Sequence, residues 1–146
     1  MEKLNKGLRT KYDNFKKCYE ALGKVIQLQE QLAISAASNP VMQDLINAGV
    51  IKHFELAYET GWKLLKEYLA NVYNCEATAP KQVFRECEKY RIFPKSMINN
   101  LITLADARNS TTHIYNQILA QEVCNDIIKH YQVFGQVLKT IPPLVE

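Results

Sequence analysis

Turn-forming residues are scarce in this sequence, since glycine and proline each occur five times in 146 residues. A protein made of many short strands needs such residues at intervals of about ten positions, so an all-β fold is disfavoured. Apolar runs of membrane-spanning length are also missing, and the opening stretch MEKLNKGLRTKYDNF lacks the apolar core of a signal peptide. We therefore expect a soluble protein without a membrane partner.

Cysteine is present, but not in a pattern that binds metal or forms a redox pair. Cys18, Cys75, Cys87 and Cys124 are widely spaced, with no CxxC pair and no cluster with histidine. This spacing predicts free thiols, no structural metal and no cofactor. Free thiols are typical of a reducing compartment, so we expect a cytoplasmic protein.

The net charge of +3 is modest, and many of the basic residues lie near the N-terminus. A mildly basic chain tolerates an RNA or nucleotide partner without requiring one. The sequence lacks a stripe of arginine and lysine with interleaved aromatic residues, which is typical of nucleic-acid-binding proteins. We therefore interpret the N-terminal basic cluster as a solvated helix face; it comprises Lys3, Lys6, Arg9, Lys11, Lys16 and Lys17.

Apolar residues recur every three or four positions over most of the chain, which indicates amphipathic helices. Three long helices and shorter ones, joined by short loops, predict an all-α fold: an antiparallel four-helix bundle with an additional short helix. The bundle forms a single domain over residues 1–146. The expected helices run from Leu4 to near Ser35–Ser38, from Val41 to Tyr73, from Lys81 to Tyr90, from about Met97 to residue 108, and from Asn116 to Lys139.

Local signals mark several helix ends and one packing point. The run at residues 38–40, Ser-Asn-Pro, predicts the end of the first helix, followed by a cap and a proline at the start of the second. Thr78 is expected to cap the third helix, with Pro80 in its first turn. Gly61 lies inside the second helix, where a tolerated glycine indicates a close approach of another helix.

Glu55, Glu59 and Lys63 form a charged ridge at successive i,i+4 steps of the second predicted helix. Such a ridge is normally a solvated face, although it is also suited to line a groove. A metal site would need additional acidic groups from a partner.

The segment RNSTTHIY at residues 108–115 places polar groups where the apolar stripe of the fourth helix should continue. The three hydroxyl residues at 110–112 are poor in helix interiors and good as caps, so the helix should end or loosen here. Arg108 and His113 are five positions apart and would diverge by about 140° on a straight helix. A break between them would bring both toward one cavity.

Arginine and histidine together supply the groups that RNA cleavage without a metal needs. The planar fork of Arg108 matches phosphate and stabilises charge that builds at phosphorus. His113 is suited to move a proton at the ribose 2′-OH or at the leaving oxygen. Asn109 would orient the histidine or bind a phosphate oxygen. The same spacing also fits a structural role, in which the two side chains cap carbonyl groups and fix a turn.

Three segments together resemble the HEPN superfamily in its HepT-like form. Arg108-x4-His113-x-Tyr115, with asparagine after the arginine, matches the Arg-x4-6-His motif and its HepT-like ending His-x-Tyr. The stretches GVIKHFELAYETGWKLLKEYL (Gly49–Leu69) and APKQVFRECEKYRIF (Ala79–Phe93) resemble the nucleotidyltransferase substrate-binding protein branch. The combination is far more specific than the Arg-x4-His spacing alone.

The resemblance implies a homodimeric bundle in which two Arg-x4-His motifs face one cleft. It also implies a partner, a small nucleotidyltransferase of the minimal (MNT) type. HepT-like proteins act as ribonuclease toxins, and the partner antitoxin silences them by adding AMP to the tyrosine of His-x-Tyr. Carried over to this chain, Arg108 and His113 would be catalytic and Asn109 would support them. Tyr115 would be the site of AMPylation.

Three functions remain open at the level of the sequence. The first is a metal-independent endoribonuclease toxin that a nucleotidyltransferase neutralises. The second is a non-catalytic subunit that holds a nucleotide or another substrate for that nucleotidyltransferase. The third is a helical partner without chemistry of its own. Arg108, His113 and Tyr115 are all present, but an arginine–histidine pair suits both cleaving RNA and gripping a nucleotide phosphate.

Overall fold

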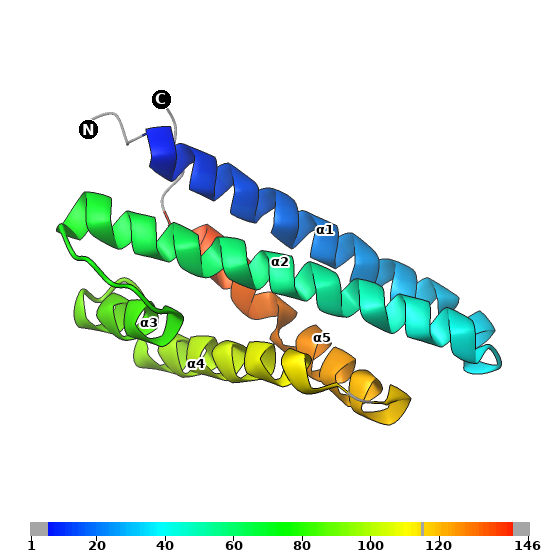
Figure 1. The fold of residues 1–146 in the computed structure, drawn as a ribbon. Helices are drawn as coiled ribbons and strands as arrows, with labels where there is room; N and C mark the ends of the chain where they lie inside the picture. The colour runs from blue at the N-terminus through cyan, green and yellow to red at the C-terminus, as the bar shows by residue number, and fades with distance from the viewer. Residues whose placement is uncertain (1–5, 115, 142–146) are drawn as a thin grey trace.

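The computed structural model describes residues 6–114 and 116–141, apart from the side chains of His113 and Gln117. Within these residues every regular element is a helix (Figure 1), as the apolar periodicity predicted. Its elements are α1 (Lys6–Ala37), α2 (Pro40–Tyr73), α3 (Pro80–Lys89), α4 (Lys95–Ser110), the 3-10 turn η1 (Thr111–His113) and α5 (Gln117–Thr140). None of the described helices is long and apolar enough to cross a lipid bilayer.

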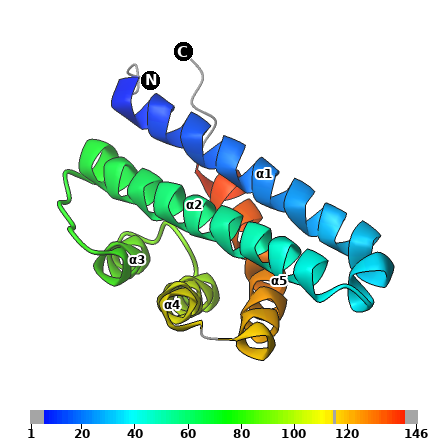
Figure 2. The same ribbon diagram turned by 45° about the vertical axis from the view of Figure 1, so that its right-hand side comes forward.

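The helices form the predicted bundle of four, with α3 as the additional short helix. The two longest helices, α1 and α2, run side by side in opposite directions, and α3 and α4 lie on the other side of α2 (Figures 1 and 2). The last helix, α5, contacts α1, α2 and α4 and so closes the bundle. The turn after α4 contacts the middle of α2 at Glu55, and the start of α5 lies beside the N-terminal half of α2, so the candidate site is positioned between these contacts.

The predicted boundary between the first two helices is confirmed, whereas the predicted cap of α3 is wrong. The Asn39 side chain accepts a hydrogen bond from the Met42 N–H at 3.1 Å, and proline follows it at the start of α2. Before α3, the cap position is Ala79, without a side-chain hydrogen bond. The reason lies in Gln82, whose side-chain oxygen accepts from both the N–H and the hydroxyl of Thr78.

Aromatic rings join the helices at the centre of the bundle. Phe134 of α5 packs against Phe15 of α1 and Phe54 of α2, with ring centroids 6.0 and 5.9 Å apart. All three rings are buried. Edge-on and tilted contacts at this spacing are the favourable geometry for aromatic pairs. These ring contacts therefore fix the position of α2 relative to the first and last helices, α1 and α5.

The close approach predicted at Gly61 is confirmed. A Cβ atom on this residue would lie 2.9 Å from Cε1 of the buried Phe15 ring, which is closer than real Cβ contacts come. Gly49 of the same helix differs, because the nearest neighbour of its added Cβ atom, Cγ1 of Val25, would be 3.8 Å away. The lack of a side chain is thus required at the first glycine and not at the second.

This contrast gives a matched pair of variants with opposite expected effects. Gly61→Ala should lower the free energy of unfolding by about 1 kcal/mol or more, because overpacking costs roughly 1–3 kcal/mol and exceeds the gain in helix propensity. Gly49→Ala should raise it by about 0.5–1 kcal/mol, because only the propensity changes. Urea unfolding followed by circular dichroism measures both. Equal stabilisation by the two substitutions would contradict the close approach of α1 to Gly61.

Candidate functional site at the junction of α4 and α5

The α-helix ends within the motif, as predicted, but between Arg108 and His113 the backbone only tightens from α to 3-10 geometry and the extended residue follows the histidine. Helix α4 ends at Ser110, η1 makes one tight turn, and Ile114 is extended, with φ −93° and ψ 115°. Asn116 then caps α5, since its side-chain oxygen accepts from the Leu119 N–H at 2.9 Å. The chain therefore changes direction within the motif.

Hydroxyl groups explain why the helix stops here. Thr112 donates to the carbonyl oxygen of Asn109 at 2.8 Å, and Thr111 Oγ1 lies 2.8 Å from the carbonyl oxygen of Arg108, which is one of two acceptors within reach of its single proton. Ser110 donates to the carbonyl of Asp106 at 3.1 Å. A single bond of this kind is tolerated inside a helix, as at Thr10 of α1 and Thr60 of α2, so it is the run of three consecutive hydroxyl residues that distinguishes the end of α4.

Arg108 is held across the bundle by an acidic residue of α2. Its Nη1 lies 3.1 Å from Oε2 of Glu55, and the two side chains are 26% and 27% exposed. Thr111 connects them: its Oγ1 lies 2.8 Å from the same Glu55 oxygen and 2.9 Å from Arg108 Nη1. The guanidinium is thus fixed at the helix break while it keeps access to solvent.

One donor of this arginine lacks an acceptor. The Nε atom of Arg108 is buried and has no hydrogen-bond partner among the described residues. A buried N–H without a partner costs about 1–3 kcal/mol. Because this Nε is closed off from solvent, a phosphate would have to bind at the exposed part of the guanidinium, whose side chain is 26% accessible.

Tyr58 lies next to this cluster and stays protonated at neutral pH. Burial is the main reason that its pKa is raised to about 12; Glu59 and Asp106 raise it further, while Arg108 opposes them. A neutral phenol donates or accepts a hydrogen bond, but it does not act as a base near pH 7. Tyr58 is therefore not a proton acceptor for the site.

The other residues predicted for the site are placed differently. Asn109 is exposed on the last turn of α4, and among the described contacts its side chain does not join Arg108. The backbone of His113 forms the last residue of η1, two positions after Thr111. The side chain of His113 lies outside the described part of the structure. Tyr115 lies outside the described residues.

Glu55 is the site residue that the sequence did not reveal. Its helical spacing suggested a solvated ridge, and this is correct for its neighbours, because Lys63 Nζ lies 3.6 Å from Glu59 Oε2. Glu55 instead contacts a threonine 56 residues further along the chain. Local sequence carries no signal for a contact between such distant positions.

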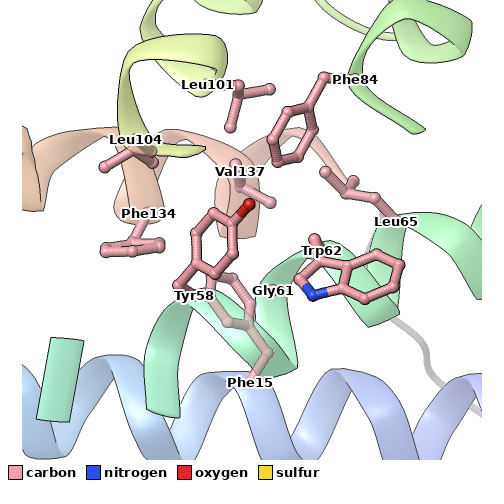
Figure 3. A pocket seen from close by; sticks show the side chains of 10 residues that line it. All are labelled: Phe15, Tyr58, Gly61, Trp62, Leu65, Phe84, Leu101, Leu104, Phe134 and Val137. Atoms are coloured by element: carbon pink, nitrogen blue, oxygen red, sulfur yellow. The ribbon is translucent and has the colours of Figure 1, made fainter. Parts of the chain in front are cut away.

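Two hollows lie near the site, and they differ in kind. The small cavity in Figure 3 has a volume of only about 10 Å³, room for one water, and its walls are aromatic and aliphatic, so it belongs to the core. A larger open groove of about 420 Å³ adjoins the turn after η1. Its walls include Asp44, Ala48 and Ile51 of α2 together with Ile114, Asn116 and Ala120. The groove runs directly beside the predicted catalytic segment.

The two buried cysteines do not offer a competing reactive site. All four are free, and Cys87 and Cys124 are buried. Burial raises the pKa of Cys87 to about 12 and that of Cys124 to about 11. Thiols with such pKa values stay protonated and are poor nucleophiles. Among the described residues, no group of three histidine, cysteine, aspartate or glutamate side chains is arranged to hold a metal ion.

Solved structures define the class of fold. The tri-AMPylated Shewanella oneidensis HEPN toxin, solved in complex with MNT antitoxin, superposes with a TM-score of 0.69 at 17% identity, covering 94% of this chain and 97% of that one. A toxin–antitoxin structure with AMP-PNP gives 0.73 at 14% identity, covering 94% and 99%. A protein from Thermus thermophilus, 25% identical, gives 0.62 over 83% and 99%. The bundle is thus the all-helical HEPN fold.

The family is more specific than the fold. The family model described as "nucleotidyltransferase substrate binding protein like" matches residues 10–141, and the chain belongs to this family, as its sequence predicted. A probable ribonuclease HepT from Haemophilus influenzae is 30% identical over 87 residues. That match covers 57% of this chain, and it spans 58% of the length of the relative.

Proposed function

We propose that this protein is the ribonuclease toxin of a toxin–antitoxin pair whose antitoxin is a minimal nucleotidyltransferase. The observation that carries the proposal is the arginine fixed at the helix break. Arg108 is held by Glu55 and Thr111, keeps about a quarter of its side chain exposed, and precedes the turn that ends at His113. The HepT relative and the HEPN toxin structures support a reaction of this class.

The proposed reaction is a transesterification that needs no metal ion. His113 takes the proton of the ribose 2′-OH, the 2′ oxygen bonds to phosphorus, and the bond from phosphorus to the 5′ oxygen breaks. The proton is returned to the 5′ oxygen, so the products are a 2′,3′-cyclic phosphate and a 5′-hydroxyl. Arg108 stabilises the extra negative charge on the phosphate oxygens, and Asn109 assists at the edge of the site.

We further propose that the protein acts as a cytoplasmic homodimer and that Tyr115 is its control point. The MNT antitoxin bound to the Shewanella toxin, which carries AMP groups, supports such a partner for this chain. An AMP group on Tyr115 would be bulky and would bring negative charge close to Arg108. It would therefore compete with the RNA phosphate for the same cation.

The family description favours one other function, a non-catalytic subunit that presents substrate to the nucleotidyltransferase. The two functions predict different results when purified protein is incubated with RNA in the presence of EDTA. A toxin yields fragments with cyclic phosphate ends. It loses this activity after treatment with the nucleotidyltransferase and ATP, while Tyr115 gains AMP in peptide mass spectra. Tyr115→Phe should resist the silencing. Intact RNA in every sample would reject the ribonuclease.

A further inference from the structure

A second groove opens on α2, farther from the break between α4 and α5. It has a volume of about 310 Å³ and lies between α1 and α2. Lys11 of α1 and Trp62, Lys63, Lys66 and Glu67 of α2 form its walls. Three lysines, one glutamate and an indole make this surface cationic and aromatic at once.

The second groove and the candidate site share one side of α2. At 100° per residue, Glu55, Glu59, Trp62 and Lys66 lie within roughly 60° of one another around the helix axis. Trp62 is about 10 Å along the axis from Glu55, and Lys66 is about 16 Å from it. An extended nucleic-acid strand covers such distances in a few nucleotides. The same strand therefore reaches Arg108 and the second groove.

The carboxylates of Glu55 and Glu59 on this path are already engaged, whereas Glu67 in the wall of the groove forms no ion pair with a residue that the structure describes. Glu55 is paired with Arg108, while Glu59 accepts from Trp62 Nε1 at 3.4 Å and pairs with Lys63 at 3.6 Å. Lys11 and Lys66, by contrast, are not ion-paired with any residue that the structure describes. These two ammonium groups outnumber the one unpaired carboxylate of the groove, that of Glu67, so the groove keeps an excess of positive charge.

Trp62 supplies a fixed aromatic surface. Its indole also borders the core cavity shown in Figure 3, next to Leu65 and Phe84, and its N–H is held by Glu59. The ring therefore does not have to be ordered when a ligand arrives. Aromatic side chains beside cationic ones are the usual platform for single-stranded nucleic acid, because bases stack on the ring while lysines contact phosphates.

We propose that the groove formed by Lys11, Trp62, Lys63, Lys66 and Glu67 binds single-stranded RNA a few nucleotides away from the bond cleaved at Arg108. A base stacks on Trp62, and Lys11 and Lys66 contact the phosphates beside it. Stacking on an indole tolerates any base, so this subsite adds affinity without strong sequence preference. The proposal rests on the ribonuclease function and adds to it a defined place for the rest of the strand.

Trp62 is the only tryptophan in the chain, so its fluorescence reports on this groove alone. The probe is a 2′-O-methyl oligouridylate of about ten nucleotides, long enough for a single-strand site and resistant to cleavage. Saturable quenching of the fluorescence is expected. Lys66→Glu and Lys11→Glu should each weaken binding several-fold and lower the slope of log K against log salt by about 0.7. Lys129→Glu, the same charge change at an exposed position of α5, should bind as the wild type does.

Three results would overturn the proposal. The first is oligonucleotide binding, detected by anisotropy, that leaves Trp62 fluorescence unchanged. The second is equal affinity in the Lys66→Glu and Lys129→Glu variants. The third is a Lys66→Glu variant that keeps RNA binding but loses the nucleotidyltransferase, which would make the groove a protein interface. Cleavage assays on the same variants separate the ribonuclease function from the subsite. If the wild type cleaves RNA and Lys66→Glu and Lys11→Glu cleave it equally well, only the subsite is refuted.

Discussion

Replacing His113 with alanine is expected to slow RNA cleavage by about 10²–10⁴-fold, the usual contribution of a positioned general acid or base. Alanine removes the proton acceptor for the 2′-OH and leaves the arginine in place. Single-turnover cleavage of end-labelled RNA, with protein in excess, measures the chemical step. The far-ultraviolet circular dichroism and the melting temperature should stay unchanged, because the residue ends a short turn between two helices.

The other two histidines provide the control for this variant. His53 and His130 are half-buried within α2 and α5. His130→Ala should therefore cleave RNA at the wild-type rate. A His113→Ala protein that leaves the same RNA ladder as the wild type would remove the histidine from the mechanism, and with it the ribonuclease interpretation of the motif.

The bundle was predictable from the sequence because each helix carries its own local signals. Periodic apolar residues predicted the number and order of helices, and the asparagine–proline pair at 39–40 predicted the start of α2. The predicted cap of α3 was wrong, although the sequence contains a threonine in a typical place. A glutamine side chain competed for Thr78, and competition between two side chains depends on geometry that a one-dimensional pattern does not hold.

The site was predictable only in part, for the same physical reason. The cluster of hydroxyls predicted the break after Arg108, because those hydroxyls bond within their own turn. Glu55 was not predictable, because its carboxylate meets Arg108 and Thr111 only after α2 and α4 pack together. The groove formed by Lys11, Trp62, Lys63, Lys66 and Glu67 was not predictable either, because it also depends on contacts between residues far apart in the sequence. The sequence around Lys11 indicates a solvated charge, and its position beside Trp62 exists only in the folded bundle.

The two sides of α2 carry different kinds of residue. Its buried side holds the aromatic core, in which Phe54 packs against the last helix. Its open side carries Glu55, Glu59 and Trp62 in line. One rigid helix would thus set the distance between the proposed catalytic arginine and the proposed RNA groove, and a site built on a packed helix holds its geometry better than one built on loops.

Arg108→Lys is expected to lower the rate of cleavage by about 10²–10³-fold, nearly as much as Arg108→Ala. Lysine keeps the positive charge but lacks the planar fork, so it does not hold Glu55 and Thr111 and bind a phosphate at the same time. The measurement is kcat and KM for RNA cleavage: the loss should lie mainly in kcat, because the missing interaction forms as charge builds on the phosphate.

Glu55→Gln is the informative companion to this variant. Its amide oxygen still accepts hydrogen bonds from Arg108 and Thr111, so the arginine should keep its place and the rate should fall less than in Arg108→Lys. Glu55→Ala removes the anchor altogether, and its rate should fall further than that of Glu55→Gln. If Arg108→Lys instead cleaves RNA at the wild-type rate, the planar guanidinium of Arg108 does not contribute to catalysis. The contacts among Arg108, Glu55 and Thr111 would then have only a structural role at the C-terminal end of α4.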